Sequence, residues 1–278
     1  MQEFKKYKDQ EKIIEAMKKS IKKLQEFGKL CSPTGGEIFF RRAASIKKRL
    51  EKIEKLDKPD VKKEINLKFN TDIRSGKEVL KIENFDLSIN ENKLLTNANL
   101  KLFYKEKACV VGDNGVGKST FIKEILKNDK YLGSNIKLGY IPQEIIFENE
   151  DLSILEESRK HFVGIEEHLR AALYKFLFIG ENIHKKIKFL SGGEKVRLKL
   201  FCLIQESYNF LVLDEPTNHI DIDTREILEE ALINFRGTIL FVSHDRYFIN
   251  KIANNIIEIK AKKITKYIGN YDDYRSHN

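Results

Sequence analysis

Two stretches near the N-terminus carry apolar residues at alternating three- and four-residue steps, with lysines and glutamates almost everywhere between them. Such spacing places the apolar residues on one face of a helix. Between the two stretches, Pro33 and the paired Gly35 and Gly36 are expected to break both helices. The pattern predicts an antiparallel helical hairpin within residues 1–70, with Pro33–Gly36 at its tip. The two apolar series are Ile14, Met17, Ile21 and Leu24, and then Phe39, Ala43, Ile46, Leu50 and Ile53.

The rest of the chain, residues 71–278, alternates short apolar runs with amphipathic segments. This alternation predicts an α/β domain with a largely parallel sheet, in which residues 152–180 form a small helical lobe. The expected strands are 79–82, 98–103, 108–111, 136–141, 210–213 and 238–242, and the other expected helices are 121–126 and 195–207.

One segment between an expected strand and an expected helix fits the pattern G-x-x-x-x-G-K-[ST]. Glycines there let backbone N–H groups approach a polyphosphate, and the helix N-terminus adds partial positive charge. Lys118 is expected to reach the β- and γ-phosphates, and Ser119 to hold Mg²⁺. The predicted phosphate-binding loop consists of Gly112, Asp113, Asn114, Gly115, Val116, Gly117, Lys118, Ser119 and Thr120.

Further candidate residues follow in three places along the chain. Ser191, Gly192 and Gly193 open a predicted helix, whose N-terminal N–H groups suit an anion. Asp214 and Glu215 follow a buried strand, which suits one carboxylate for Mg²⁺ and one for polarising an attacking water. His244 ends another strand, where it could donate to a γ-phosphate; a lone histidine there is more commonly structural.

Charge is concentrated at the N-terminus. Residues 1–68 contain 20 basic and 11 acidic side chains, whereas the remainder contains 31 of each, so the whole net charge of +9 lies in the first quarter. Lysine-rich helix faces can simply be solvated, but this cluster also suits a nucleic-acid backbone. The basic residues Arg41, Arg42, Lys47, Lys48 and Arg49 belong to it.

Composition excludes several classes of protein. Apolar runs are too short for a membrane-spanning helix, and the charged N-terminus does not read as a signal peptide. Three widely spaced cysteines argue against a disulfide framework, and neither they nor the six histidines have the spacing of a metal site. We therefore expect a cytoplasmic protein.

Together these motifs resemble the ATP-binding cassette ATPases. Residues 112–120 look like Walker A, 190–194 like the signature, and 210–215 like Walker B with its catalytic glutamate. Gln143 resembles the Q-loop glutamine, Asp221 the D-loop and His244 the switch histidine. The resemblance implies a P-loop ATPase fold, ATP and Mg²⁺ as cofactors, and catalytic roles for Glu215, His244 and Gln143. It also implies Mg²⁺ contacts by Ser119, Gln143 and Asp214, and nucleotide contacts by Ser191, Gly192, Gly193 and Asp221.

Residues 214–221 and 243–248 resemble the F subfamily, whose members act on ribosomes instead of driving transport. Residues 41–50 are similar to the segment that links the two F-type cassettes and reaches the tRNA-binding region. The resemblance implies rRNA and tRNA as partners of residues 1–70, and relief of ribosome-bound antibiotics as one role. A transporter motor is the alternative, although such a motor needs no basic hairpin. The chromosome-maintenance ATPases are a third candidate class, because they also combine a signature with a coiled coil. Their coiled coil interrupts the cassette between Walker A and the signature, whereas the helices of this sequence precede Walker A.

Two features depart from the F-type pattern. Ile89 occupies the position that often carries an adenine-stacking aromatic residue. The family has two cassettes on one chain, whereas this sequence looks like the linker plus the second cassette. Because each ATP is bound between the Walker A loop of one cassette and the signature of another, Lys118 and Ser191 are expected to serve different nucleotides. The expected partner is therefore a second cassette, in a homodimer or on a missing N-terminal half.

Overall fold

The computed structural model describes residues 14, 17, 19–26, 29, 33–51 and 74–276. The chain divides into two units, Met1–Glu64 and Ile65–Asn278. Within the described residues, no helix is both long enough and apolar enough to cross a membrane.

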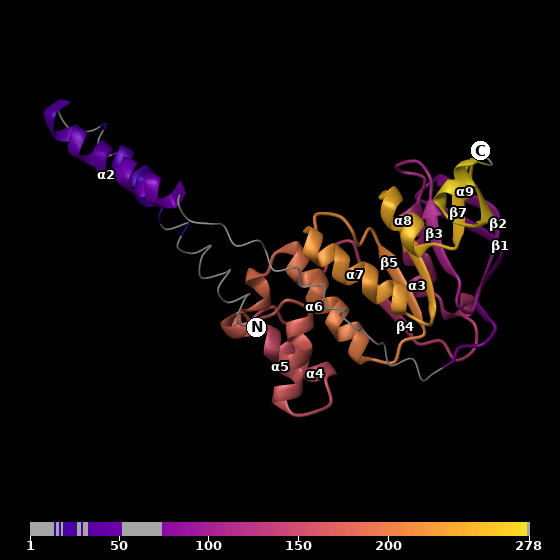
Figure 1. Ribbon diagram of the computed structural model, residues 1–278. Helices are drawn as coiled ribbons and strands as arrows, with labels where there is room; N and C mark the ends of the chain where they lie inside the picture. The colour runs from indigo at the N-terminus through magenta and orange to yellow at the C-terminus, as the bar shows by residue number, and fades with distance from the viewer. Residues whose placement is uncertain are drawn as a thin grey trace. The chain divides into compact units, whose positions relative to one another are not determined.

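The first unit is helical wherever it is described. Residues 19–26 are helical, and helix α2 covers Pro33–Glu51 (Figure 1). On α2, Ala43 is buried and Ile46 and Leu50 are half-buried, which confirms the apolar face expected for this segment.

The predicted tip at Pro33–Gly36 is wrong, because these residues form the start of α2. Proline is tolerated at the first helical positions, where its missing N–H would have no partner within the helix. Residues 31–32 and 52–73 lie outside the described ranges, and the antiparallel hairpin stays a prediction.

The second unit is built on a six-stranded sheet with strand order β4-β5-β6-β3-β7-β8. Neighbouring strands from β4 to β7 run parallel, and β8 pairs antiparallel with β7, so the expected parallel sheet is confirmed. The strands are β3 (Lys107–Val111), β4 (Leu138–Ile141), β5 (Phe210–Asp214), β6 (Thr238–Val242), β7 (Asn255–Lys260) and β8 (Lys263–Ile268).

A separate antiparallel hairpin precedes this sheet and consists of β1 (Glu78–Ile89) and β2 (Asn92–Phe103). The helices of the unit are α3 (Lys118–Lys127), α4 (Ile154–His161), α5 (Glu166–Lys175), α6 (Gly192–Gln205), α7 (Ile222–Asn234), α8 (Arg246–Ile252) and α9 (Tyr271–Ser276). Short 3-10 helices lie at Asp129–Tyr131 (η1), Gly180–His184 (η2) and Ile187–Phe189 (η3).

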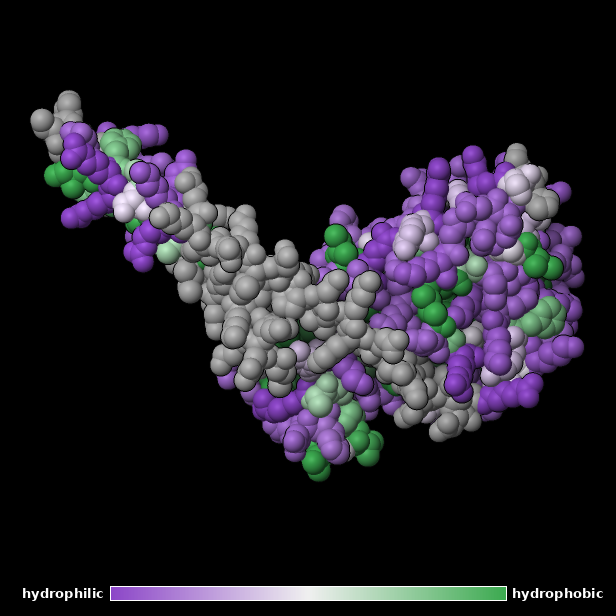
Figure 2. Space-filling view, viewed as in Figure 1, coloured by the Kyte–Doolittle hydropathy of each residue, from purple (hydrophilic) through white to green (hydrophobic). Residues whose placement is uncertain are grey.

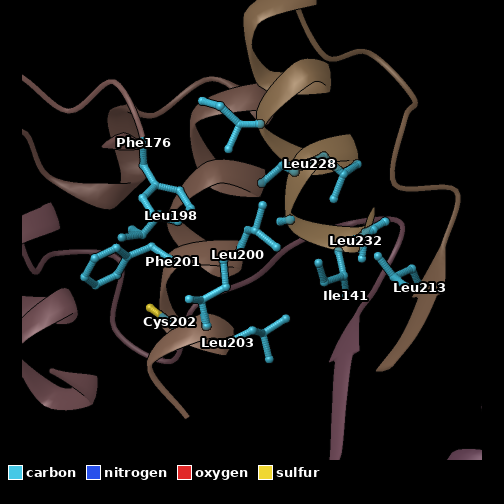
Figure 3. Close-up of a cluster of buried hydrophobic side chains, with 14 of the residues drawn as sticks. Ile141, Phe176, Leu198, Leu200, Phe201, Cys202, Leu203, Leu213, Leu228 and Leu232 are labelled. Atoms are coloured by element: carbon cyan, nitrogen blue, oxygen red, sulfur yellow. The ribbon is translucent and has the colours of Figure 1, made fainter. Parts of the chain in front are cut away.

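The sheet separates two apolar clusters, because alternate residues of a strand point to opposite faces. Along β5, Leu211 and Leu213 belong to the cluster with α4 to α8, whereas Phe210 and Val212 belong to the cluster with α3 and the β1–β2 hairpin. Figure 3 shows part of the first cluster, in which Phe176 and Phe201 pack edge to face. With both faces covered, the sheet fixes the loops at the carboxyl ends of its parallel strands, where the phosphate-binding loop, Gln143, Asp214, Glu215 and His244 lie.

Candidate functional site

The predicted phosphate-binding loop connects β3 to α3, as the sequence indicated. Gly112, Gly115 and Gly117 have positive φ angles of 153°, 83° and 101°. Two of them are also sterically restricted: a Cβ at Gly117 would lie 2.8 Å from Cδ1 of Leu94, and one at Gly112 would lie 2.5 Å from the carbonyl oxygen of Ile259. The loop therefore depends on glycine for both its backbone conformation and its packing.

Lys118 is buried, and its ammonium group folds back over the loop. Its Nζ donates to the carbonyl oxygens of Gly112, at 2.9 Å, and Asp113, at 3.0 Å. These contacts hold the positive charge of the ammonium group against the loop. An incoming polyphosphate could take over the same N–H donors as charge-assisted hydrogen bonds.

Ser119 and Asp214 come from distant parts of the sequence but are in contact. The Ser119 hydroxyl donates to Oδ1 of Asp214 over 3.0 Å, because α3 packs against β5, the strand that ends in Asp214. Asp214 is buried, with only 1% of its surface exposed. A hydroxyl and a carboxylate oxygen at this spacing are the oxygen ligands that Mg²⁺ accepts, so the residues present fit this ion.

Glu215 and His244 form the second pair at this edge of the sheet. Oε1 of Glu215 lies 3.2 Å from Nε2 of His244. Oε2 of Glu215 is buried and has no hydrogen-bond partner among the described residues. Burial raises the pKa of Glu215, while His244 and Lys118 act to lower it and the Asp214 carboxylate adds to the rise. One carboxylate oxygen is therefore held by the histidine, and the other is left for a further donor such as water.

The local backbone gives Glu215 its direction. Its φ is +50°, in the left-handed region that glutamate rarely adopts, and its N–H donates to the carbonyl oxygen of Val242 over 3.0 Å. A non-glycine residue in this region is held there by its surroundings and is a common feature of functional sites.

Gln143 lies just beyond the end of β4 and is exposed. Ile141 of β4 pairs with Leu213 of β5, so Gln143 leaves the sheet at the same edge as Asp214. Its predicted contacts with Mg²⁺ and with the attacking water stay predictions.

The remaining predicted residues gather at a different place, around the N-termini of α6 and α7. Ser191 caps α6 in a reciprocal box with Glu194, and Asp221 caps α7 by accepting from the N–H of Thr224 at 2.8 Å. A Cβ on Gly193 would lie 3.0 Å from Oδ2 of Asp221, so signature and D-loop residues adjoin. Ser191 and Asp221 are exposed. Helix α6 packs against α7, α4 and β4, whereas α3 packs against β5 and η1.

Known proteins similar to this chain were found in three kinds of comparison. The family model described as ABC transporter matches residues 95–218. The chain is 40% identical to YdiF of Bacillus subtilis over 277 residues, covering 96% of this chain and 43% of YdiF. It is 32% identical over 277 residues to ABC transporter F family member 5 of Arabidopsis thaliana, covering 95% and 40%. Over almost its whole length the chain is thus similar to F-family members of the ATP-binding cassette proteins.

Another relative is the ribosome protection protein VmlR of Bacillus subtilis, 35% identical over 251 residues, which are 84% of this chain and 44% of VmlR. The chain spans less than half the length of these three relatives. Among solved structures, an ATP binding subunit of an ABC transporter aligns with a TM-score of 0.58 at 19% identity, over 72% of this chain and 92% of the subunit. At that identity the likeness shows the fold alone.

Cassettes of this kind bind ATP with Mg²⁺, and the Lys118 ammonium group and the Ser119–Asp214 pair fit these two ligands. Ile89, at the position often occupied by an adenine-stacking aromatic residue, ends β1 and is 46% exposed. Leu94 lies near the start of β2, the strand that pairs with β1, and its side chain is close to Gly117. The turn between β1 and β2 therefore adjoins the phosphate-binding loop. An aliphatic side chain in this position offers apolar contact without ring stacking.

Two contacts near the Glu215–His244 pair, each between residues that neighbour it in the sequence or the fold, were not expected from the sequence. The hydroxyl groups of Thr217 and Ser243 lie 3.2 Å apart and join the loops that carry Glu215 and His244. Arg225 of α7 binds the carboxylate of Asp245. Both contacts link segments that meet only after folding, and the sequence pattern carries no signal for them beyond the motifs nearby.

Proposed function

We propose that this chain is the hairpin and second cassette of a ribosome-associated F-family ATPase, and that it hydrolyses ATP only when paired with another cassette. The observation that carries the catalytic part is the Glu215–His244 pair beside the Ser119–Asp214 pair. Bound Mg²⁺ would neutralise phosphate charge during transfer, with Ser119 and Asp214 holding it. Gln143, at the same edge, is proposed to complete this set.

In the proposed hydrolysis, Lys118 binds the terminal phosphates and Glu215 orients and polarises the attacking water through its unpartnered oxygen Oε2. His244 keeps the Glu215 carboxylate in place through Oε1 and donates toward the γ-phosphate. The raised pKa makes Glu215 a stronger base than an exposed glutamate, which suits it to take up a proton.

The proposed pairing with a second cassette rests on the exposed positions of Ser191 and Asp221. Helix α6 presents its capped N-terminus at the surface, where its dipole and N–H groups suit the phosphate of a nucleotide held by another cassette. Lys118 and Ser191 would then serve different ATP molecules, as the family resemblance implies.

The proposed partner of the first unit is ribosomal RNA or tRNA. Helix α2 carries five basic residues between positions 41 and 49, and all of them are exposed. Figure 2 shows a mostly hydrophilic surface on this helix. Among the described residues, Arg41 alone of these five forms an ion pair, with Glu37, and both side chains are exposed. Such a pair is weak in water and would exchange readily for a phosphate.

VmlR, a relative of this cassette, is named for ribosome protection. Relief of a ribosome-bound antibiotic, by a protein acting in the cytoplasm, is therefore our finer proposal. A transporter motor finds less support, because the likeness to transporter subunits lies at 19% identity and shows the fold alone.

Co-sedimentation with ribosomes across a salt series tests the ribosomal proposal. The variant replaces Arg41, Arg42, Lys47, Lys48 and Arg49 with Gln, which retains helix propensity. Its affinity for ribosomes should fall by about 10-fold or more at low salt, with a flatter salt dependence, because fewer counterions are released.

The matched control removes the same number of charges from exposed lysines of the cassette, by replacing Lys77, Lys123, Lys127, Lys175 and Lys262 with Gln. This control should bind ribosomes nearly as well as the parent chain. Equal pelleting of the α2 variant and the parent at every salt concentration would contradict a ribosome-binding role for α2. An equal loss in both variants would show that binding depends on total charge alone.

A further inference from the structure

Arg225 connects the helix that follows the D-loop to the loop that carries His244. It lies in the first turns of α7, which Asp221 caps. Its Nη1 lies 2.7 Å from Oδ2 of Asp245, and its Nη2 donates to Oδ1 of the same carboxylate over 3.1 Å. Two parallel N–H···O bonds fix the orientation of a carboxylate as well as its distance, which a single lysine ammonium cannot do.

Arg225 is itself held from the other side. Its Nε donates to Oε1 of Glu229 over 2.8 Å, and the Glu229 side chain is only 4% exposed. The other oxygen of Glu229 accepts from Nζ of Lys251, on α8, over 2.7 Å. The hydrogen bond that Arg225 donates to Glu229 and the nearby Asp245 carboxylate raise the pKa of Arg225, so the guanidinium stays charged. The guanidinium therefore has little freedom to move away from Asp245.

Asp245 also holds the backbone on both sides of itself, next to His244. Its Oδ1 accepts from the N–H of Phe248 and so caps α8, while its own N–H donates to the Ser243 hydroxyl over 3.1 Å. Ser243 is buried, but His244 is exposed, with 56% of its side chain accessible. An exposed side chain gains little from its own packing, so its position depends on the backbone that carries it.

We propose that Arg225 is a positioning residue for ATP hydrolysis. By binding the Asp245 carboxylate, it fixes the backbone of residues 243–245 and keeps His244 in contact with Glu215. This proposal rests on the proposed hydrolytic role of that pair. In the described part of the chain, Arg225 forms its hydrogen bonds and ion pairs with Glu229 and Asp245 and with neither the pair nor the phosphate-binding loop, so it acts through Asp245. Small displacements of a catalytic group can cost about 100-fold in rate.

The kinetic test compares Arg225→Gln, Arg225→Lys and Asp245→Asn, all in the full chain and at a protein concentration at which the parent turns over. Arg225→Gln should lower kcat by about 10-fold or more and leave KM for ATP within about 2-fold. The kcat of Arg225→Lys should lie between that of the parent and that of Arg225→Gln. Asp245→Asn retains a good helix cap, so it weakens the ion pair while preserving α8. It should lower kcat in the same way.

The matched control is Arg170→Gln on α5. Arg170 also makes two bonds to a carboxylate, that of Glu166, but its partner lies one turn away on the same exposed helix. Loss of this pair should leave kcat unchanged. If Arg225→Gln also leaves kcat unchanged while the protein remains folded, the positioning role is wrong.

A second measurement does not depend on turnover. The NMR ring signals of His244, assigned with His244→Gln, should move when Glu215 is changed to Gln, because the carboxylate contact is lost. In the Arg225→Gln background this movement should shrink. If the His244 signals shift as far in the Arg225→Gln background as in the parent, the proposal is wrong. A joint fall in kcat and thermal stability would then show only a structural role for Arg225. If the parent itself does not hydrolyse ATP, the proposed function fails, whereas the NMR result still decides whether Arg225 positions His244.

Discussion

Glu215 and His244 lie 3.2 Å apart, Oε1 to Nε2, because they follow neighbouring parallel strands. Asp214, at the end of β5, pairs with Val242, at the end of β6; Glu215 follows Asp214 directly, and His244 follows Val242 after Ser243. The N–H of Glu215 also donates to the carbonyl oxygen of Val242, so the first residue of one loop is tied to the end of the other strand. The register of two buried strands thus determines the geometry of the pair.

Replacing Glu215 with Gln should slow ATP hydrolysis by about 100-fold or more while leaving ATP binding intact. The change removes the carboxylate that is proposed to polarise water but retains the size and shape of the side chain. Steady-state turnover and equilibrium binding of ATP, measured on the same purified preparation, check the two halves of this prediction. Unchanged turnover would refute the catalytic role of Glu215.

The same substitution should stabilise the protein against unfolding at neutral pH, by about 1 kcal/mol. The pKa of Glu215 is raised by burial, so folding favours the protonated carboxyl. Its contribution to stability is present below the ordinary pKa of 4.5 and is lost as pH rises through the raised value. The free energy of unfolding of the two proteins, from urea denaturation at several pH values, should therefore converge near pH 4.5 and diverge above it. A parent that is the more stable protein at pH 7 would contradict this prediction.

Sequence reasoning was most successful where local requirements are strong. The phosphate-binding loop needs glycines at fixed positions, and buried strands need unbroken apolar runs, so both could be located from the residues alone. The carboxyl ends of β5 and β6 were located in the same way, which brought Asp214 and His244 to one edge of the sheet. The helix starting at Gly192 was also expected, within three residues of its true beginning.

It was less successful where the outcome depends on context. Pro33, Gly35 and Gly36 were expected to stand outside both helices, but they begin α2, because proline is tolerated at the first positions of a helix. The Arg225–Asp245 contact depends on how α7 and α8 pack, and that packing is set by the apolar residues of both helices together. Charged residues on helix faces are so common that neither residue could be singled out beforehand.

Lys118→Ala should weaken ATP binding by about 10-fold or more, because it removes charged N–H donors from a site built for phosphates. Titration with a fluorescent ATP analogue measures this loss. Lys123, exposed on the same helix, is the matched control, and Lys123→Ala should bind the analogue like the parent. Equal affinity for Lys118→Ala and the parent would mean that the loop is not the binding site.

The rate of hydrolysis per molecule should rise with protein concentration, because the proposed complete site combines Lys118 of one cassette with Ser191 of another. Ser191 and Gly192 are exposed, and a Cβ added at Gly192 would meet nothing within 4 Å, so the N-terminus of α6 is open to a partner. Turnover that is independent of concentration down to the nanomolar range would contradict the need for pairing.

Mixing two inactive variants provides a sharper test of the same idea. Lys118→Ala spoils the phosphate-binding loop, and Ser191→Arg spoils the signature by placing a bulky cation where a small N-cap is needed. A homodimer of either variant has two defective sites. A mixed dimer has one site with both defects and one with neither, so each mixed dimer should turn over at about half the parent rate if the sites act independently. Because random pairing at a one-to-one ratio makes about half of the dimers mixed, the mixture as a whole should reach about a quarter of the parent rate. Recovery requires that the two residues act on the same nucleotide from different chains. If the mixture stays as inactive as its components while each variant still folds and dimerises, Lys118 and Ser191 act within one chain, and the proposed sandwich is wrong.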